Sequence, residues 1–253
     1  MCGRFSVGFE ADDLSRKLDA LLRDDTIYPS PSLQFNPTDP VTFLRGRTGD
    51  DGSLRRELAV GRWGLIPSFA ESFESRLPSW NARSETAATL ASFKGPLQKW
   101  RAVVPVSAYY EYKKSGPGRK DPKQRYIIEP DGDLITFAGL FAFWRDESIA
   151  DRKDPGAWRL SCSILTMPTP PAETHEGLHY LHDRLPVPLA PDMIDDWIDP
   201  EQKDGSGLLM PRWPEPTAWR PPGNCGPWIW WTRTPAWWTS PILWPEQAWP
   251  WSL

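Results

Sequence analysis

The chain has 253 residues, of which 40% are hydrophobic and 25% are charged, a composition typical of a globular protein with one large domain or two small ones. Its formal net charge of -4 excludes a uniformly basic surface, so nucleic acid is expected to bind only at a local basic patch. The polar start, the lack of a run of about 18 apolar residues and the odd number of cysteines argue against a secreted, membrane-inserted or disulfide-framed protein. We therefore expect a cytoplasmic protein, nucleoid-associated in a prokaryote, with no membrane partner.

The first third of the chain predicts one helix and two strands. Residues 10–24 place leucines at helical spacing behind an acidic start, which is typical of an amphipathic helix. A proline-punctuated loop at 28–40 leads into a strand at 41–45. A turn at 47–53 then joins this strand to another at 57–67.

The middle of the chain predicts further strands and two helices. Residues 81–93 look helical, with Asn81 or Ser84 as the N-cap, and residues 192–198 form a short second helix. The expected strands are the stretches of apolar, β-branched and aromatic residues at 102–114, 125–130, 133–144 and 158–166. Many short strands with few helices predict an α+β fold with a mostly antiparallel, barrel-like β-sheet core and a few flanking helices.

The stretch 213–253 does not follow this pattern. It holds ten of the sixteen tryptophans, interleaved with proline and without a helical or strand period. We expect a catalytic domain at 1–212 and an atypical tail at 213–253. The favoured interpretation of the tail is an out-of-frame translation of a natural C-terminus. A Trp-rich binding arm and core strands of unusual sequence are the alternatives.

Cys2 follows the initiator Met1 directly in the opening MCGRF. Removal of Met1 would give one residue both an α-amine, with a pKa of about 7.7–8.0, and a thiol. This 1,2-aminothiol condenses with an aldehyde to an imine and then to a thiazolidine, whereas a lysine stops at the imine. The alternative is that Cys2 is merely a small residue near a terminus.

Four stretches carry a family resemblance: MCGRF at 1–5, RWGLIPSF at 62–69 with NARSET at 81–86, VPVSAYYEY at 104–112, and LHDRLP at 181–186. Together and in this order they resemble the SRAP family, named for the SOS response-associated peptidase. The resemblance runs from residue 1 to about residue 190. Members of the family process abasic sites in single-stranded DNA.

The resemblance implies a catalytic Cys2 that crosslinks to the ring-opened aldehyde of an abasic site as a thiazolidine, which shields the lesion during the response to DNA damage. It implies Asn81 near the Cys2 amine, Glu111 as acid or base, and His182 as a second proton-transfer group. A buried glutamate with a raised pKa and a histidine with a pKa near 6.5 suit the proton transfers that open the sugar and expel water. Without the motif, Glu111 would be expected to face solvent and Asn81 to act only as a cap.

DNA contact is expected from one arginine in each motif, which together form a local cationic cluster around Cys2 for phosphates. These arginines are Arg4, Arg62, Arg83 and Arg184. The alternative for each is an ion pair with a carboxylate. Trp63 and Phe93 either stack on exposed bases or belong to the core. Pro37 is expected to line the groove beside the lesion.

No cofactor and no metal are expected. His175 and His179 stand in HEGLH at a spacing that two zinc ligands can use, but no third ligand is evident. We expect a monomer with single-stranded DNA containing abasic sites as its partner. Two other functions stay open: a thiol peptidase that uses Cys2 with Glu111 and His182 on itself or on other proteins, and a binding module that uses the Trp-rich tail.

Overall fold

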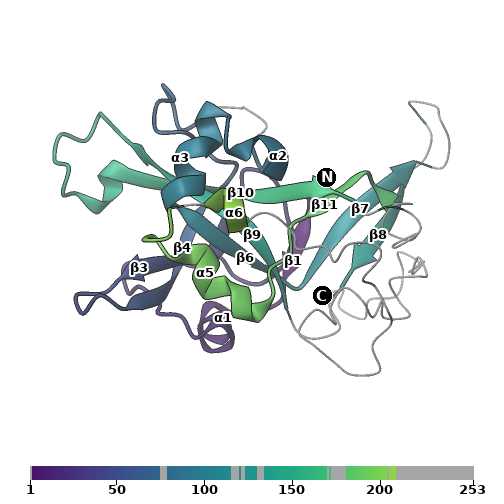
Figure 1. Cartoon of the computed structure of the whole chain (residues 1–253), viewed down its shortest axis with the longest axis horizontal. Coiled ribbons are helices and arrows are strands. Elements are labelled where there is room, and N and C mark those ends of the chain that lie inside the picture. The colour runs from purple at the N-terminus through teal and green to yellow at the C-terminus, as the bar shows by residue number, and fades with distance from the viewer. Residues whose placement is uncertain are drawn as a thin grey trace, which may run out of the picture.

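The described strands form two sheets, and the larger one closes into a five-stranded barrel (Figure 1). The computed structural model describes residues 2–74, 79–114, 120, 123–129, 134–169, 171, 181–203 and 205–208. Around the barrel each strand pairs with the next, and the last pairs with the first. The strands, in this order, are β3 (Pro40–Thr48), β6 (Arg101–Val106), β9 (Ile135–Arg145), β10 (Trp158–Pro168) and β4 (Leu54–Trp63).

Two short strands extend the barrel along β10, where the site is built. β5 (Asn81–Arg83) runs parallel to β10, and β11 (Arg184–Pro186) runs antiparallel to it. The β4–β10 pair is also parallel, and the other strand pairs are antiparallel. The expected α+β fold with a mostly antiparallel, barrel-like core is therefore confirmed.

The smaller sheet contains the amino-terminal strand. Its strands, in spatial order, are β2 (Ser32–Phe35), β1 (Phe5–Val7), β7 (Ala108–Lys114) and β8 (Lys123–Ile128). β7 follows β6 after the single residue Ser107, so one long predicted strand is divided between the two sheets. Because β1 pairs with β7, the start of the chain is fixed beside the barrel (Figure 1).

Apolar side chains pack between the two sheets and among the strands of the barrel. The rings of Phe5 and Trp63 lie 4.6 Å apart between their centroids, and those of Phe43 and Phe141 lie 5.5 Å apart. Phe5, Phe43 and Trp63 have no exposed surface. Burying such aromatic side chains contributes most of the stabilising free energy of a core of this kind.

The helices among the described residues are short and lie outside the barrel (Figure 1). They are α1 (Ala11–Leu18), α2 (Ser84–Ala87), α3 (Ala91–Lys99), α5 (Ile194–Ile198) and α6 (Gly205–Leu208), with 3₁₀ turns at Pro155–Ala157 and Pro191–Met193. Within the described ranges, none of these helices is long and apolar enough to cross a membrane.

The buried guanidinium of Arg101 holds the ends of two helices in place. Arg101 is 2% exposed and donates hydrogen bonds from all three of its nitrogens to backbone carbonyls. The acceptors are the carbonyl oxygens of Leu97, Gln98, Trp197, Asp199 and Gln202. The last carbonyls of a helix have no partner within the helix, so one arginine satisfies the ends of α3 and α5 together.

Two expected helices differ from the structure. The helix predicted at 10–24 ends at Leu18, because Asp19 adopts a left-handed conformation (φ 49°) and its N–H bonds to the carbonyl of Ser15. The stretch 81–93 begins as strand β5 and becomes helical only at Ser84. Pairing with β10 draws Asn81 into the sheet, so Asn81 is not a cap, and Arg83 occupies the N-cap position in place of Ser84.

The predicted tail at 213–253 lies outside the described residues, as do His175, His179 and the third cysteine, Cys225. The division of the chain at residue 212 therefore stays a prediction.

Candidate functional site

Cys2 lies at the centre of the candidate site with no exposed surface. Its thiol donates a long hydrogen bond of 3.8 Å to the carbonyl oxygen of Arg4, and the same oxygen accepts a 3.0 Å bond from the backbone N–H of Tyr110. This second bond ties the cysteine segment to β7. Burial and the nearby charge of Glu111 raise the pKa of the Cys2 thiol well above its ordinary value, so the resting form is the thiol.

The side chain of Asn81 holds the backbone of Cys2. The pairing of β5 with Ile164 of β10 fixes Asn81, whose side-chain nitrogen donates a 2.7 Å hydrogen bond to the carbonyl oxygen of Cys2. The side-chain oxygen of Asn81 is buried and has no hydrogen-bond partner among the described residues. Such a group is costly to leave unpaired, so it is ready to accept a hydrogen bond from a donor that enters the site.

Glu111 lies on β7 at 6% exposure, and burial raises the pKa of its carboxyl. Strand alternation places Tyr109 on the same face of β7, where it is 3% exposed. Burial and the charges of Glu111 and Cys2 raise the pKa of the Tyr109 hydroxyl. Tyr109 is not among the predicted site residues. Its position two residues before Glu111 in a predicted strand indicates that both side chains lie on one face.

His182 follows the end of β10 in space and precedes β11 in the chain. Its Nδ1 accepts a 3.1 Å hydrogen bond from the backbone N–H of Arg184 and lies 2.5 Å from Oδ1 of Asp183. Burial and the positive amino terminus lower the pKa of His182, and the charge of the amino terminus also acts on Glu111. The structure thus places His182 and Glu111 close in space to the amino terminus, beside which Cys2 stands in the chain.

Two of the four predicted phosphate-binding arginines are already paired with carboxylates. Arg184 is 9% exposed and forms two parallel hydrogen bonds of 2.7 and 2.8 Å with the carboxylate of Glu85. This pairing lowers the pKa of Glu85 to about 2. Arg62 lies 3.4 Å from Oε2 of Glu74. For these two the ion-pair alternative holds, so neither is a free cation beside Cys2.

Arg4 and Arg83 remain exposed. The guanidinium of Arg4 donates a 2.5 Å hydrogen bond to the hydroxyl of Tyr112 and lies 5.1 Å from the centre of that ring. In the part of the chain that the structure describes, no carboxylate forms an ion pair with Arg4 or Arg83. Of the four predicted arginines, these two therefore stay candidates for phosphate contact, and each follows a site residue, Cys2 or Asn81, by two positions in the sequence.

The stacking role predicted for Trp63 and Phe93 is wrong in this structure. Trp63 has no exposed surface and its indole N–H bonds to the carbonyl of Trp80, while Phe93 is 8% exposed on the inner side of α3. Both belong to the core, which was the alternative. The exposed aromatic residue of the same motif is Phe69, at 66% exposure in the loop between β4 and β5.

Pro37 lies half-buried in the loop between β2 and β3. The next residue, Thr38, has φ 84°, an unfavourable value for a β-branched residue, and its N–H bonds to the carbonyl of Trp63 at 2.7 Å. This bond fixes the loop to the end of β4, the strand that leads into the RWGLIPSF motif.

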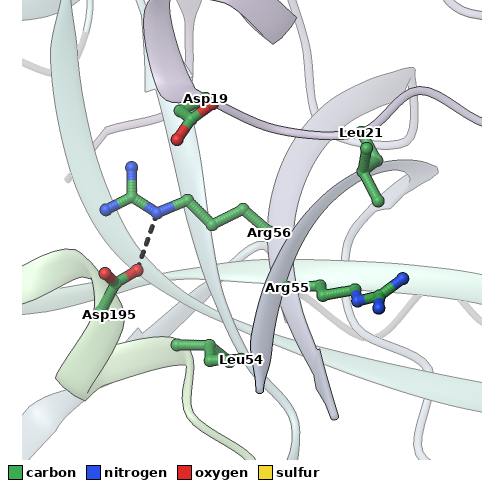
Figure 2. A pocket seen from close by; sticks show the side chains of 6 residues that line it. All are labelled: Asp19, Leu21, Leu54, Arg55, Arg56 and Asp195. Carbon is green, nitrogen blue, oxygen red and sulfur yellow. Dashed lines mark hydrogen bonds and ion pairs between the residues drawn. The ribbon is translucent and has the colours of Figure 1, made fainter. Parts of the chain in front are cut away.

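A separate hollow of about 440 Å³ lies at the start of β4, and Figure 2 shows the side chains that line it. Its lining residues are Asp19, Leu21, Leu54, Arg55, Arg56 and Asp195. Arg56 is held there by a 2.7 Å ion pair with Asp195, as Figure 2 shows. The hollow contains none of the predicted site residues, and its basic and acidic side chains balance each other.

The fold and the site define a small β-barrel protein whose cysteine at position 2 lies beside a buried glutamate and an asparagine. The chain belongs to the SRAP family: the family described as SOS response associated peptidase (SRAP) matches residues 1–220.

Two relatives illustrate the similarity. Abasic site processing protein YoqW of Bacillus subtilis (strain 168) is 32% identical over 216 residues, which cover 83% of this chain and 87% of that protein. Abasic site processing protein YedK of Escherichia coli (strain K12) is 31% identical over 205 residues, which cover 79% of this chain and 81% of that protein. Among solved structures, a protein from Bacteroides thetaiotaomicron superposes with a TM-score of 0.63 at 24% identity, covering 82% of this chain and 86% of the other, and supports the fold alone.

Proposed function

We propose that this protein forms a covalent thiazolidine crosslink between Cys2 and abasic sites in single-stranded DNA, and so protects the lesion from strand cleavage. The observation that supports this proposal most directly is that Asn81 and Glu111 lie close to Cys2 in the fold. Relatives named abasic site processing proteins support the same substrate. No cofactor takes part in the proposed reaction.

The reaction begins once Met1 has been removed. The α-amine of Cys2 attacks the aldehyde carbon of the opened sugar, and loss of water gives an imine. The sulfur then adds to the same carbon and closes the five-membered ring, so that one water leaves overall. Asn81 positions the attacking residue through its bond to the Cys2 carbonyl, and its free side-chain oxygen can accept from the amine.

Glu111 and His182 supply the protons. The raised pKa of Glu111 favours its protonated form, which can donate to the ring oxygen as the closed sugar opens. The resulting carboxylate of Glu111 can then take the proton of the Cys2 thiol. The two groups together carry one negative charge before and after this transfer, so no second negative charge forms beside the first. Burial and the amino terminus lower the pKa of His182, so its imidazolium gives up a proton readily near neutral pH, as an acid that protonates the departing water must.

The grip on DNA is assigned to Arg4, Arg83 and Phe69. The two arginines are exposed and can contact phosphates. Phe69 is exposed in the RWGLIPSF motif and can stack on an unpaired base. This grip is local, which agrees with the net charge of -4.

The alternative of a thiol peptidase fits the site less well. A cysteine peptidase needs a thiol whose pKa is lowered by a nearby cation, whereas burial and Glu111 raise the pKa of Cys2. The thiol bonds to the carbonyl of Arg4, which does not activate it.

The test is incubation of the purified protein with a single-stranded oligonucleotide that carries one abasic site. We expect an adduct that survives denaturing electrophoresis without borohydride, with an intact mass equal to both components minus one water. Cys2→Ala removes the adduct, and Cys162→Ala, which removes a buried thiol far from the site in the sequence, keeps it. A folded protein with Met1 removed that gives no adduct would overturn the proposal.

A further inference from the structure

Nδ1 of His182 has two hydrogen-bonding neighbours, one a donor and one an acceptor, and it can bond to only one of them at a time. The backbone N–H of Arg184 points a donor at Nδ1 over 3.1 Å, and a carboxylate oxygen of Asp183 lies 2.5 Å from the same atom. An imidazole nitrogen carries either a lone pair or a proton. The contact with Arg184 therefore belongs to the form with a bare Nδ1, and the contact with Asp183 belongs to the form with a protonated Nδ1.

The backbone around His182 is held in place by hydrogen bonds to the end of β10. Thr169 donates from its hydroxyl to the carbonyl of His182 at 2.7 Å and from its N–H to the carbonyl of Asp183 at 2.9 Å. Arg184 pairs with Pro168 in the sheet. The segment is thus held against the end of β10, while the Asp183 side chain itself is 84% exposed.

The charge of Asp183 acts on both proton-transfer groups of the site. Burial raises the pKa of Glu111, the amino terminus opposes this effect, and the charge of Asp183 adds a smaller rise. At His182 burial, the amino terminus and Arg184 all lower the pKa, whereas Asp183 opposes them. One carboxylate therefore favours the protonated form of each group.

We propose that Asp183 is a positioning residue that holds the Nδ1 proton of His182, so that Nε2 delivers its proton to the departing water in the crosslinking reaction. The imidazolium loses the Nε2 proton and becomes a neutral imidazole whose Nδ1–H still donates to Asp183. The next proton enters at Nε2 and restores the starting form. When Nδ1 carries no proton, its lone pair accepts the hydrogen bond from the backbone N–H of Arg184, and the ring proton is on Nε2. This role rests on the proposed function.

Several other groups face this pair and bear on its titration. They are the amino terminus on the first segment and Arg184 on β11, whose charges act on His182, and Glu111 on β7, on which the charge of Asp183 acts. Arg184 and the amino terminus are positive, so removal of Asp183 leaves His182 with these opposing charges. Water screens the exposed Asp183, so its effect is of moderate size.

The first test follows the three histidines of the full-length protein by ¹⁵N NMR during a pH titration, without DNA. His182→Gln identifies the signal of His182 by its loss. In Asp183→Asn we expect the midpoint of His182 to move to lower pH, with the protonated fraction above the midpoint falling about two- to fivefold. Asp183→Ser should give the same shift, and Asp183→Glu should restore the original midpoint.

The control is Asp196→Asn, which removes one exposed carboxylate on α5 and should leave the midpoint unchanged. An unchanged midpoint in Asp183→Asn, or an equal shift in Asp196→Asn, would overturn the assignment of Asp183. Because this readout needs no substrate, it can fail or succeed independently of the crosslinking activity.

The second test is the pH dependence of the crosslinking rate. Loss of Asp183 should move both limbs of the profile to lower pH, because both Glu111 and His182 lose a charge that favours their protons. A purely structural role would lower the rate at every pH and leave the limbs in place. A shifted NMR midpoint combined with unmoved limbs would overturn the role of Asp183 in the reaction.

Discussion

The side chain of Asn81 reaches across 79 positions of the chain to donate a 2.7 Å hydrogen bond to the backbone carbonyl of Cys2. This bond joins β5, which is anchored on the barrel, to the segment that carries the proposed nucleophile. The cysteine is thereby positioned through its backbone carbonyl, so this bond does not engage its nitrogen or its thiol.

Replacing Asn81 with Ala should slow crosslinking and leave folding nearly intact. A lost hydrogen bond of this kind is worth about 0.5–1.5 kcal/mol, so we expect a fall of roughly three- to tenfold in the single-turnover rate. Quenched-flow samples run on denaturing gels measure this rate. Ser84→Ala, three residues later at the start of α2, is the control and should keep the wild-type rate. A wild-type rate in Asn81→Ala would show that the bond has no positioning role.

Glu111 should make the protein less stable as pH rises. Its pKa is raised in the folded state, so the folded protein holds the proton more tightly than the unfolded chain does. The stabilising contribution is complete below the ordinary glutamate pKa of about 4.3 and is lost as pH rises through the folded pKa. Urea unfolding across pH 4–8 should show a decline that Glu111→Gln removes. Glu129→Gln, in which an exposed glutamate is replaced, should keep the decline.

The contribution of Glu85 to the free energy of unfolding should have the opposite pH dependence. Arg184 holds the pKa of Glu85 at about 2, so the pair stabilises the fold above the ordinary glutamate pKa and loses its effect as pH falls toward 2. We expect Glu85→Gln to lower the free energy of unfolding at pH 7 by about 1–2 kcal/mol, since it leaves a nearly buried guanidinium with a neutral partner. The difference from wild type should shrink steadily in urea titrations below pH 4. A constant difference at all pH values would contradict the ion pair.

The sequence predicted the barrel correctly, whereas the surroundings of the predicted site residues were harder to predict. Apolar, β-branched and aromatic composition indicated the strands, and the order of the motifs singled out Cys2, Asn81, Glu111 and His182 as candidates. Exposure was harder to predict, because the packing of Trp63 against Phe5 depends on strands far apart in the chain.

Long-range pairing limited the prediction of the cationic cluster in the same way. Arg184 and Glu85 are separated by 99 positions, and nothing local to either motif indicates that they meet. The N-cap assigned to Asn81 was wrong because pairing with β10 overrides local helix signals. Tyr109 could have been found, since a strand places residues i and i+2 on one face.

Arg101 should be essential for stability. Arg101→Met keeps most of the apolar stem but leaves the carbonyls at the ends of α3 and α5 without their donor. We expect a loss of about 3–5 kcal/mol in the free energy of unfolding, the range for breaking a buried charged network. Arg152→Met, at an exposed position before the 3₁₀ turn, is the matched control and should stay within about 0.5 kcal/mol of wild type. Chemical denaturation followed by tryptophan fluorescence measures both.

Phe69 and Phe93 separate DNA contact from core packing within one residue type. Phe69 is 66% exposed, so Phe69→Ala should leave the free energy of unfolding nearly unchanged and weaken binding to single-stranded DNA by about 1–3 kcal/mol, the value of one stacked base. Phe93 is 8% exposed, so Phe93→Ala should instead destabilise the fold by about 3–5 kcal/mol. Leu33→Ala removes a side chain of 70% exposure on β2 and should change neither quantity. Fluorescence anisotropy with a labelled oligonucleotide, at one fixed salt concentration, measures the affinities. Equal affinities for wild type and Phe69→Ala would assign the grip on DNA to the exposed arginines alone.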